Sequence, residues 1–236
     1  CTACTVLRGG KVTGVCDPRE ESNASLSRLM IGAEPPALQH RAVQTGGTVL
    51  QVNKLSLPRD DQFGMNLEDI SLSVRAGEVV GIAGVSGNGQ RELLYALSGE
   101  DTRAAPAMVQ IHGQDAGRMG PGQRRKLGVN FVPEERLGRG AVPAMGLAHN
   151  LMLTRTDAIG RSGWIKVGAL QRQAESIIQR FNVKTGGPHA PARSLSGGNL
   201  QKFIVGREID AKPKLLIVPQ PTWGVDVGAA AQIRGE

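Results

Sequence analysis

A continuously apolar segment that runs directly into a glycine-rich loop constrains the fold of this chain more than any other feature. Residues 78–83 (EVVGIA) precede residues 84–92 (GVSGNGQRE), and an apolar helical face begins at Leu93. Continuously apolar strands are typical of sheets that are buried on both faces in α/β proteins. A strand, a glycine loop and a helix in this order place backbone N–H groups and a helix N-terminus around a phosphate. The segment therefore predicts a phosphate-binding loop between a buried strand and a helix.

The end of this loop departs from the usual phosphate-binding pattern. Gly84 and Gly89 have the spacing of a P-loop, but Gln90 and Arg91 stand where Lys and Ser or Thr are expected. Arg91 keeps a positive charge one position late, and one residue turns a helical side chain by about 100°. Taken alone, the loop also fits a dinucleotide-binding turn or a plain glycine-rich turn. The glycine spacing at 81–87 does not give G-x-G-x-x-G, which disfavours the dinucleotide interpretation.

Strand and helix patterns alternate along the chain and predict an α/β fold with a parallel sheet. Apolar and polar residues alternate at 49–55 and 70–74, whereas 129–132 and 214–218 are apolar strand-like runs. Residues 146–181 are mostly helical in pattern, with apolar side chains at helical spacing towards their end. A helical insertion between two strands predicts a second lobe.

A second motif decides between the interpretations of the loop. Residues 195–202 read LSGGNLQK, and the run LLIVPQPTWGVDVGA follows about a helix length later. A glycine loop, a helical lobe, an LSGG sequence and a buried strand in this order resemble the nucleotide-binding domain of ABC transporters. LSGGNLQK, GVSGNGQREL and FVPEER together are similar to the second half of the tandem ATPases that drive bacterial simple-sugar and nucleoside importers. The resemblance covers residues 48–236.

The resemblance implies an α/β P-loop NTPase fold of the ABC type, with a mostly parallel core sheet, an antiparallel β part and a helical subdomain at about 134–197. Residues 1–34, which contain TVLRGGKVTGV and LSRLMIG, are similar to the closing hairpin and last helix of a preceding nucleotide-binding domain. We expect a linker at 35–47, where prolines and glycines replace apolar periodicity. The second nucleotide-binding domain would span 48–236 and stop before its switch histidine.

The resemblance also implies roles for individual residues. Glu134 would lie in the loop that senses magnesium and couples to the membrane subunit, and Asp226 would lie in the aspartate loop that bridges two nucleotide sites. The signature residues would contact the γ-phosphate of ATP held by the opposite domain: Ser196, Gly197 and Gly198. The loop residues would hold the phosphates of ATP: Gly84, Ser86, Gly87, Asn88, Gly89, Gln90 and Arg91.

The strand that should end in an Asp-Glu pair departs most from the family pattern. Pro219 and Gln220 occupy these two positions. A proline and an amide neither bind a metal as anions nor accept a proton, so we expect weak Mg²⁺ binding and poor ATP hydrolysis at this half-site. Gln220 and Glu134 are the candidate catalytic positions, and no metal ligand is assigned. An intact LSGG beside a degenerate loop predicts an asymmetric pair, in which this half completes the partner domain's ATP site.

The amino-acid composition limits the classes of binding partner that we expect. The net charge is +7, which favours a rival interpretation as a soluble ABC-type ATPase that acts on nucleic acid or ribosomes. Only seven residues are aromatic, however, and single-strand binders use stacking aromatics, so we expect no nucleic-acid partner. Cys1, Cys4 and Cys16 crowd the N-terminus without a fourth ligand that would complete a zinc site. An odd number of cysteines without a pairing pattern fits a reducing compartment.

The sequence therefore predicts an ATP hydrolase subunit of an importer, active in the full assembly and weak by itself. Its expected partners are the opposite nucleotide-binding domain, integral membrane permease subunits and, indirectly, a substrate-binding protein. No apolar run approaches the length of about 18 residues that suggests a membrane span. The resemblance to importer ATPases implies a peripheral position at the cytoplasmic face of the membrane. The cargo is a simple sugar or a nucleoside, and the sequence does not choose between them.

Overall fold

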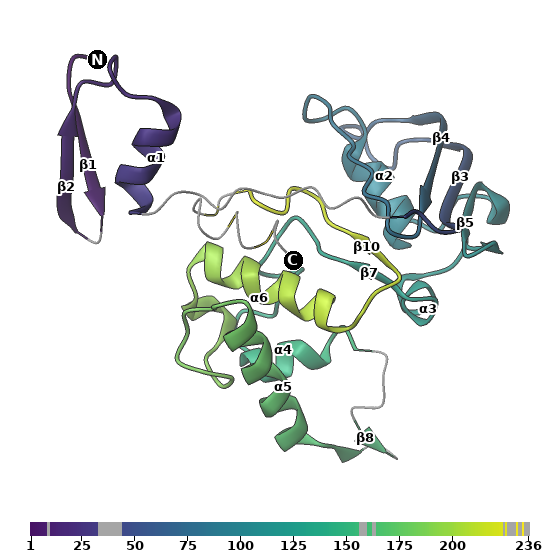
Figure 1. The fold of residues 1–236 in the computed structure, drawn as a ribbon. Helices are drawn as coiled ribbons and strands as arrows, with labels where there is room; N and C mark the ends of the chain where they lie inside the picture. Colours follow the sequence, from purple (N-terminus) through teal and green to yellow (C-terminus); the bar gives the residue numbers. More distant parts are fainter. Residues whose placement is uncertain are drawn as a thin grey trace.

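The computed structural model describes residues 1–8, 10–32, 44–155, 160–161, 164–223, 225, 230 and 233. Figure 1 shows an N-terminal hairpin with one helix set apart from a β-rich part and a helical part. The elements of the β-rich and helical parts are β3 (Thr48–Leu57), β4 (Leu67–Arg75), α2 (Gln90–Ser98), η1 (Pro106–Met108), β5 (Val109–Ile111), β6 (Gln114–Asp115), α3 (Pro121–Lys126), β7 (Val129–Phe131), α4 (Leu147–Met152), β8 (Gly160–Arg161), β9 (Trp164–Ile165), α5 (Val167–Arg180), η2 (Ala192–Ser194), α6 (Gly197–Asp210) and β10 (Leu215–Ile217).

The N-terminal part consists of β1 (Cys4–Arg8), β2 (Lys11–Cys16) and α1 (Asn23–Ile31). The strands pair antiparallel, and Gly10 takes the positive φ of 78° that a tight turn requires. Ser22 caps α1 by accepting a hydrogen bond from the Ser25 N–H. The hairpin and helix expected at the start of the chain are therefore confirmed.

The β-rich part is a four-stranded sheet in the order β4-β3-β5-β6, whose pairs are all antiparallel. One face of this sheet carries fully buried side chains such as Val52, Leu55 and Ile111, and Leu93 and Leu97 of α2 belong to the same core. The two alternating segments at 49–55 and 70–74 thus form half-exposed strands as predicted, and the structure shows that they pair with each other.

The helical part is built on α4, α5 and α6, which share a second hydrophobic core. The predicted apolar face of α5 is confirmed, since Leu170, Ala174, Ile177 and Phe181 are each at most 1% exposed. Parallel strands β7 and β10 run next to α6, with Leu215 opposite Val129. Among the described residues, β7 and β10 form the one parallel pair, so the parallel sheet is smaller here than the antiparallel one.

The predicted buried strand at 78–83 is wrong for this structure. No residue of the segment is assigned to a strand, and Val79 is 96% and Ile82 56% exposed. Within the described ranges, no strand pairs with the segment, and β7 and β10 form a sheet of two strands without it. An apolar strand is buried on both faces only when strands pair with its edges and other elements cover its faces, and the local sequence does not supply those neighbours.

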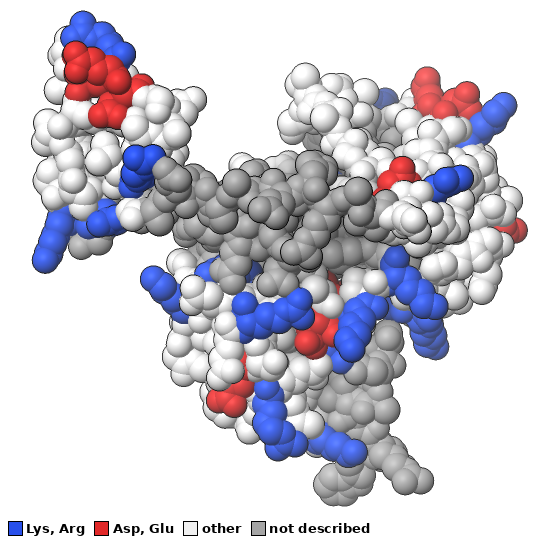
Figure 2. Space-filling view, viewed as in Figure 1, with Lys and Arg blue, Asp and Glu red and all other residues white. Residues whose placement is uncertain are grey.

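No described helix is both long enough and apolar enough to cross a bilayer. On the face drawn in Figure 2, Lys and Arg side chains are spread over the N-terminal, β-rich and helical parts, with Asp and Glu among them.

Candidate functional site

The glycine loop enters α2 through two residues in the left-handed region. Gly87 has a φ of 89° and Gly89, the N-cap of α2, has a φ of 93°. A Cβ on Gly89 would lie 3.3 Å from the Leu67 side chain, so both backbone strain and space require glycine there. No side chain caps the first turn of α2, which leaves its leading N–H groups available to an anion.

The side chain of Gln90 folds back into this loop. Its Nε2 donates to the Val85 carbonyl at 2.9 Å, and its Oε1 accepts from the Asn88 N–H at 3.0 Å. A Cβ on Gly84 would lie only 2.7 Å from the Gln90 Nε2, so glycine at 84 makes the fold-back geometry accessible. The carboxamide thus uses one of the backbone N–H groups that a phosphate would need.

Arg91 is engaged on the flank of α2. Its Nη2 lies 3.2 Å from Glu92 and 3.7 Å from Asp61. The hydrogen bond to Glu92, and then its charge, raise the pKa of Arg91. The cation is therefore held by two carboxylates beside the loop and does not replace the missing lysine, in agreement with the rotation of about 100° expected from the helix geometry.

The LSGG segment begins α6. Ser196 is its N-cap, and the Ser196 Oγ accepts from the Asn199 Nδ2 at 2.9 Å. Asn199 also accepts from the Lys184 N–H at 2.8 Å, which fixes the first turn to the preceding loop. Ser196 and Gly197 are exposed at the end of a helix of 14 residues. The positive end of the helix dipole therefore faces solvent and favours an approaching anion.

The two candidate catalytic positions meet. Gln220 Nε2 donates to Glu134 Oε1 at 3.0 Å, across 86 positions of sequence. The contact arises because β7 and β10 are parallel neighbours, and the loops that follow them leave the same edge of the pair. Both side chains are exposed, and Gln220 has a φ of 41°. The pair holds a single carboxylate, so it offers one anionic oxygen donor group.

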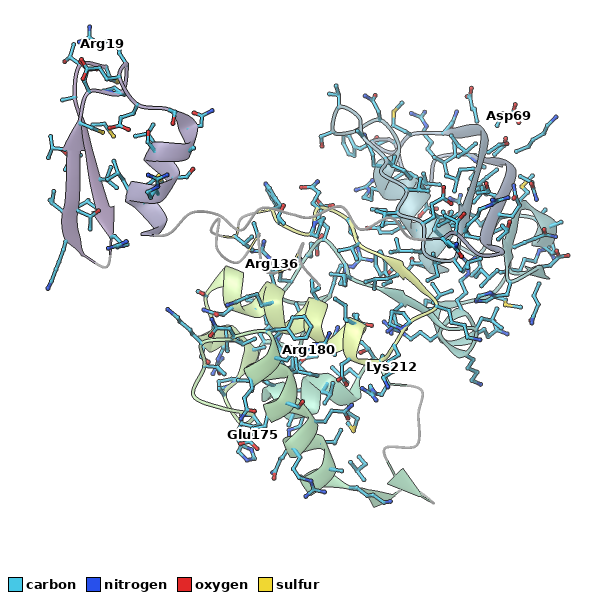
Figure 3. All side chains as sticks on the ribbon, in the orientation of Figure 1. Arg19, Asp69, Arg136, Glu175, Arg180 and Lys212 are labelled. Carbon is cyan, nitrogen blue, oxygen red and sulfur yellow. The ribbon has the colours of Figure 1, made fainter. Side chains whose placement is uncertain are left out.

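Two residues that the sequence argument missed join these loops to the LSGG helix. Gln201 is buried, accepts from the Arg136 Nε at 3.0 Å and donates to the Pro221 carbonyl at 3.2 Å. Arg136 also donates to the carbonyl of Trp223. Figure 3 shows Arg136 beside the N-terminal half of α6. The available signal was that Gln201 is a polar residue within LSGGNLQK and Arg136 a polar residue within PEER.

The structure brings only part of the predicted site together. Arg91, Glu134 and Pro219 line one small cavity of about 40 Å³, while Ser196, Gly197 and Gly198 do not line it. Asp226 lies outside the described residues. Within the described ranges, no three His, Cys, Asp or Glu side chains are grouped so that they could hold a metal ion.

Comparison with known proteins assigns the chain to a family. The family model described as ABC transporter matches residues 67–223, which include both glycine motifs. The chain belongs to the ABC transporter family. The α/β P-loop NTPase fold expected from the sequence is confirmed. The structure is similar to a nucleotide-free ATP-binding cassette from an ABC transporter, with a TM-score of 0.62, 21% identity, and coverage of 79% of this chain and 74% of that one.

Import proteins are among the similar sequences of this ABC family member. The guanosine import ATP-binding protein of Bacillus subtilis is 37% identical over 97% of this chain and 45% of its own length. The glucose import ATP-binding protein of Haloferax volcanii is 40% identical over 98% of this chain and 42% of its own length. The ribose import ATP-binding protein of Halalkalibacterium halodurans is 35% identical over 99% of this chain and 46% of its own length. The chain thus spans less than half the length of these curated relatives.

Proposed function

We propose that this chain is part of the ATP-binding subunit of an importer for a simple sugar or a nucleoside, and that the subunit couples ATP binding and hydrolysis to uptake. The observation that carries the proposal is an exposed LSGG helix end combined with a glycine loop at the start of α2. The names of the relatives, which import guanosine, glucose and ribose, support an importer over the soluble ATPase that acts on nucleic acid or ribosomes.

The proposal includes a division of the chain into domains. Residues 1–34 would end a first nucleotide-binding domain, 35–47 would link the two domains, and 48–236 would begin the second. Alignment of almost the whole chain to less than half of each relative supports this arrangement. The separate hairpin and helix at the start of the chain agree with a domain border in this region.

The half-site in this chain would hold ATP weakly. The residues fit a phosphate, because the first turn of α2 has no side-chain cap and its N–H groups face the loop. They do not fit a tightly bound magnesium ion, since Gln90 and Arg91 replace the lysine and the hydroxyl, and Gln220 contributes an amide. Without a carboxylate at Gln220, a water molecule would not be activated here. ATP bound at this loop would have mainly a structural role and would not be hydrolysed efficiently.

The LSGG end of α6 would complete the other ATP site. In a head-to-tail pair of domains, Ser196, Gly197 and Gly198 would contact the γ-phosphate bound by the opposite domain. The exposed N-terminus of α6 supports this role, since the helix dipole favours a negative charge at that end. Asp226 would lie in the loop that bridges the two sites.

The remaining partners would be integral membrane permease subunits and, through them, a substrate-binding protein. The chain would then lie at the cytoplasmic face of the membrane as a peripheral subunit. A cavity of about 210 Å³ lies where α2, α3, β7 and α6 meet and supports docking near the helical part. Its lining includes Glu100, Arg125 and Arg139, which suit a polar partner segment.

The experiment compares two variants in the complete importer. Ser196→Arg should lower ATP turnover and transport at least about tenfold, because the large cation would block the γ-phosphate contact and remove about 1.4 kcal/mol or more of transition-state stabilisation. Gln90→Ala should change turnover less than about twofold, because the loop that it alters would not be the hydrolysing one. The reverse pattern, with transport lost only in Gln90→Ala, would contradict the assignment of the two roles.

A further inference from the structure

The N-terminal hairpin places two thiols directly opposite each other. Cys4 is the first residue of β1 and Cys16 the last residue of β2, and the antiparallel register pairs them. Opposed residues in antiparallel strands have Cα atoms roughly 4.5 or 5.5 Å apart. Both separations lie within the range of roughly 4.4 to 6.8 Å that disulfides span, so no backbone movement is needed to bridge the pair.

The two side chains are also in contact and accessible. Both are free thiols of intermediate exposure, and Cys4 lies close enough to Cys16 to help raise the pKa of the Cys16 thiol. The third cysteine, Cys1, is exposed and lies outside β1. In Figure 1 the open end of the β1–β2 hairpin, where the pair sits, is the end next to the N-terminus. A small oxidant can therefore reach the pair without unfolding the hairpin.

We propose that Cys4 and Cys16 are a modification site that forms a cross-strand disulfide when the chain meets a low-molecular-weight disulfide. The Cys4 thiolate attacks one sulfur of R–S–S–R, forms a mixed disulfide and releases RS⁻, which takes up the proton that Cys4 lost. The Cys16 thiolate then attacks the Cys4 sulfur and expels the second RS⁻, which takes up the Cys16 proton. Two protein thiols are oxidised to one disulfide, and one small disulfide is reduced to two thiols.

The surroundings of Cys16 set the order of these attacks. Partial desolvation, the neighbouring Cys4 and the carboxylates of Glu21 and Asp17 all raise the pKa of Cys16. A raised pKa leaves less of the thiol ionised, and only the thiolate attacks. Cys16 is therefore disfavoured as the first nucleophile, and we assign the first attack to Cys4 and the resolving attack to Cys16.

The test uses the full 236-residue chain and oxidised glutathione as the probe. After oxidation, denaturation and alkylation with N-ethylmaleimide, mass spectrometry should count one alkylated thiol, against three in the reduced chain. The matched control Cys1→Ser should lose both of its remaining thiols, and its tryptic peptides 1–8 and 12–19 should be joined. Cys4→Ser should form no link between these two peptides, and Cys16→Ser should stop at the mixed disulfide of Cys4 with glutathione, because the resolving thiol is absent.

Several outcomes would overturn the proposal. They are the survival of all three thiols, a stable glutathione adduct on Cys4 in a chain that keeps Cys16, a disulfide-linked dimer on a non-reducing gel, or a link that persists in Cys4→Ser and disappears in Cys1→Ser. The last outcome would show that Cys1 pairs with Cys16. Peptide mapping of Cys1→Ser alone decides the result if the other variants fail to fold, and circular dichroism checks the fold of each variant.

Discussion

The carboxamide of Gln90 closes the inside of the loop that precedes α2. It bonds to the Asn88 N–H and the Val85 carbonyl, so the loop is held together by its own side chain. A phosphate that enters must displace this bond, and the neutral amide forms no ion pair with the phosphate in return. Weak nucleotide binding at this loop thus has two sources: competition for a backbone N–H and the absence of a cation.

Restoring the cation should strengthen binding. Gln90→Lys is expected to tighten ATP binding to the 236-residue chain by about tenfold, or about 1.4 kcal/mol, because an ammonium group bonds phosphate oxygens more strongly than an amide does. Titration calorimetry measures the change. Gln179→Lys adds the same charge at an exposed position of α5 and should leave the affinity unchanged. Equal gains in both variants would mean that net charge, and not the loop, sets the affinity.

At the scale of elements, α6 is the helix around which the described structure is organised. Every residue from Leu200 to Glu208 is buried, so the helix is covered on all sides and not along one stripe. The C-terminal half packs closely on α5: a Cβ at Gly206 would lie 2.6 Å from the Phe181 ring. Glycine is kept inside a helix here because only glycine lets the ring approach the backbone.

Gly206→Ala should therefore destabilise the fold. The added methyl group overlaps the Phe181 ring, at a cost of about 2 kcal/mol, which exceeds the gain in helix propensity of about 1 kcal/mol. Urea unfolding followed by circular dichroism measures the difference in the free energy of unfolding. Gly122→Ala in α3 is the matched control, because nothing lies within 4 Å of its new Cβ. A Gly206→Ala variant as stable as the Gly122→Ala variant would contradict the close packing.

At the scale of the whole molecule, one buried carboxylate joins the β-rich and helical parts. Glu208 of α6 is 0% exposed, accepts from the Arg207 Nε at 2.9 Å and accepts from the Arg125 Nη1 of α3 at 2.8 Å. Arg207 also donates to the Asn150 carbonyl of α4 at 3.2 Å. Burial lowers the pKa of Arg207, and the Glu208 charge opposes that shift. Through the guanidinium groups of Arg207 and Arg125, Glu208 thus links α6 to α3 and α4.

Glu208→Gln should remove that connection. Two guanidinium groups, one of them buried, would lose their counter-charge, and we expect the free energy of unfolding to fall by about 3 kcal/mol. Thermal unfolding monitored by circular dichroism gives the midpoint and its shift. Glu175→Gln is the control, since Glu175 lies exposed on α5 and is labelled in Figure 3. Equal midpoints for the two variants would show that the buried network contributes nothing to stability.

The extent to which the sequence predicted the site differs from residue to residue. The glycine loop at 84–91 could be foreseen, because glycines act on their immediate neighbours, whereas the N-cap role of Ser196 was recognised only in the structure. The contact between Glu134 and Gln220 could not be derived from spacing, since it depends on the parallel pairing of β7 and β10. The role of Asp226 stays a prediction.

The sequence by itself determined the family, the order of the motifs and the buried faces of the helices, because these depend on residue types at fixed local spacing. Only the tertiary structure decided how Gln201 joins Arg136 to Pro221, how Gln90 closes its loop, and that 78–83 stays exposed in this structure. The physical reason is that hydrogen-bond partners and burial are properties of the whole packed chain. An apolar or polar residue limits the surroundings it tolerates, but the neighbours that pack against it come from distant segments.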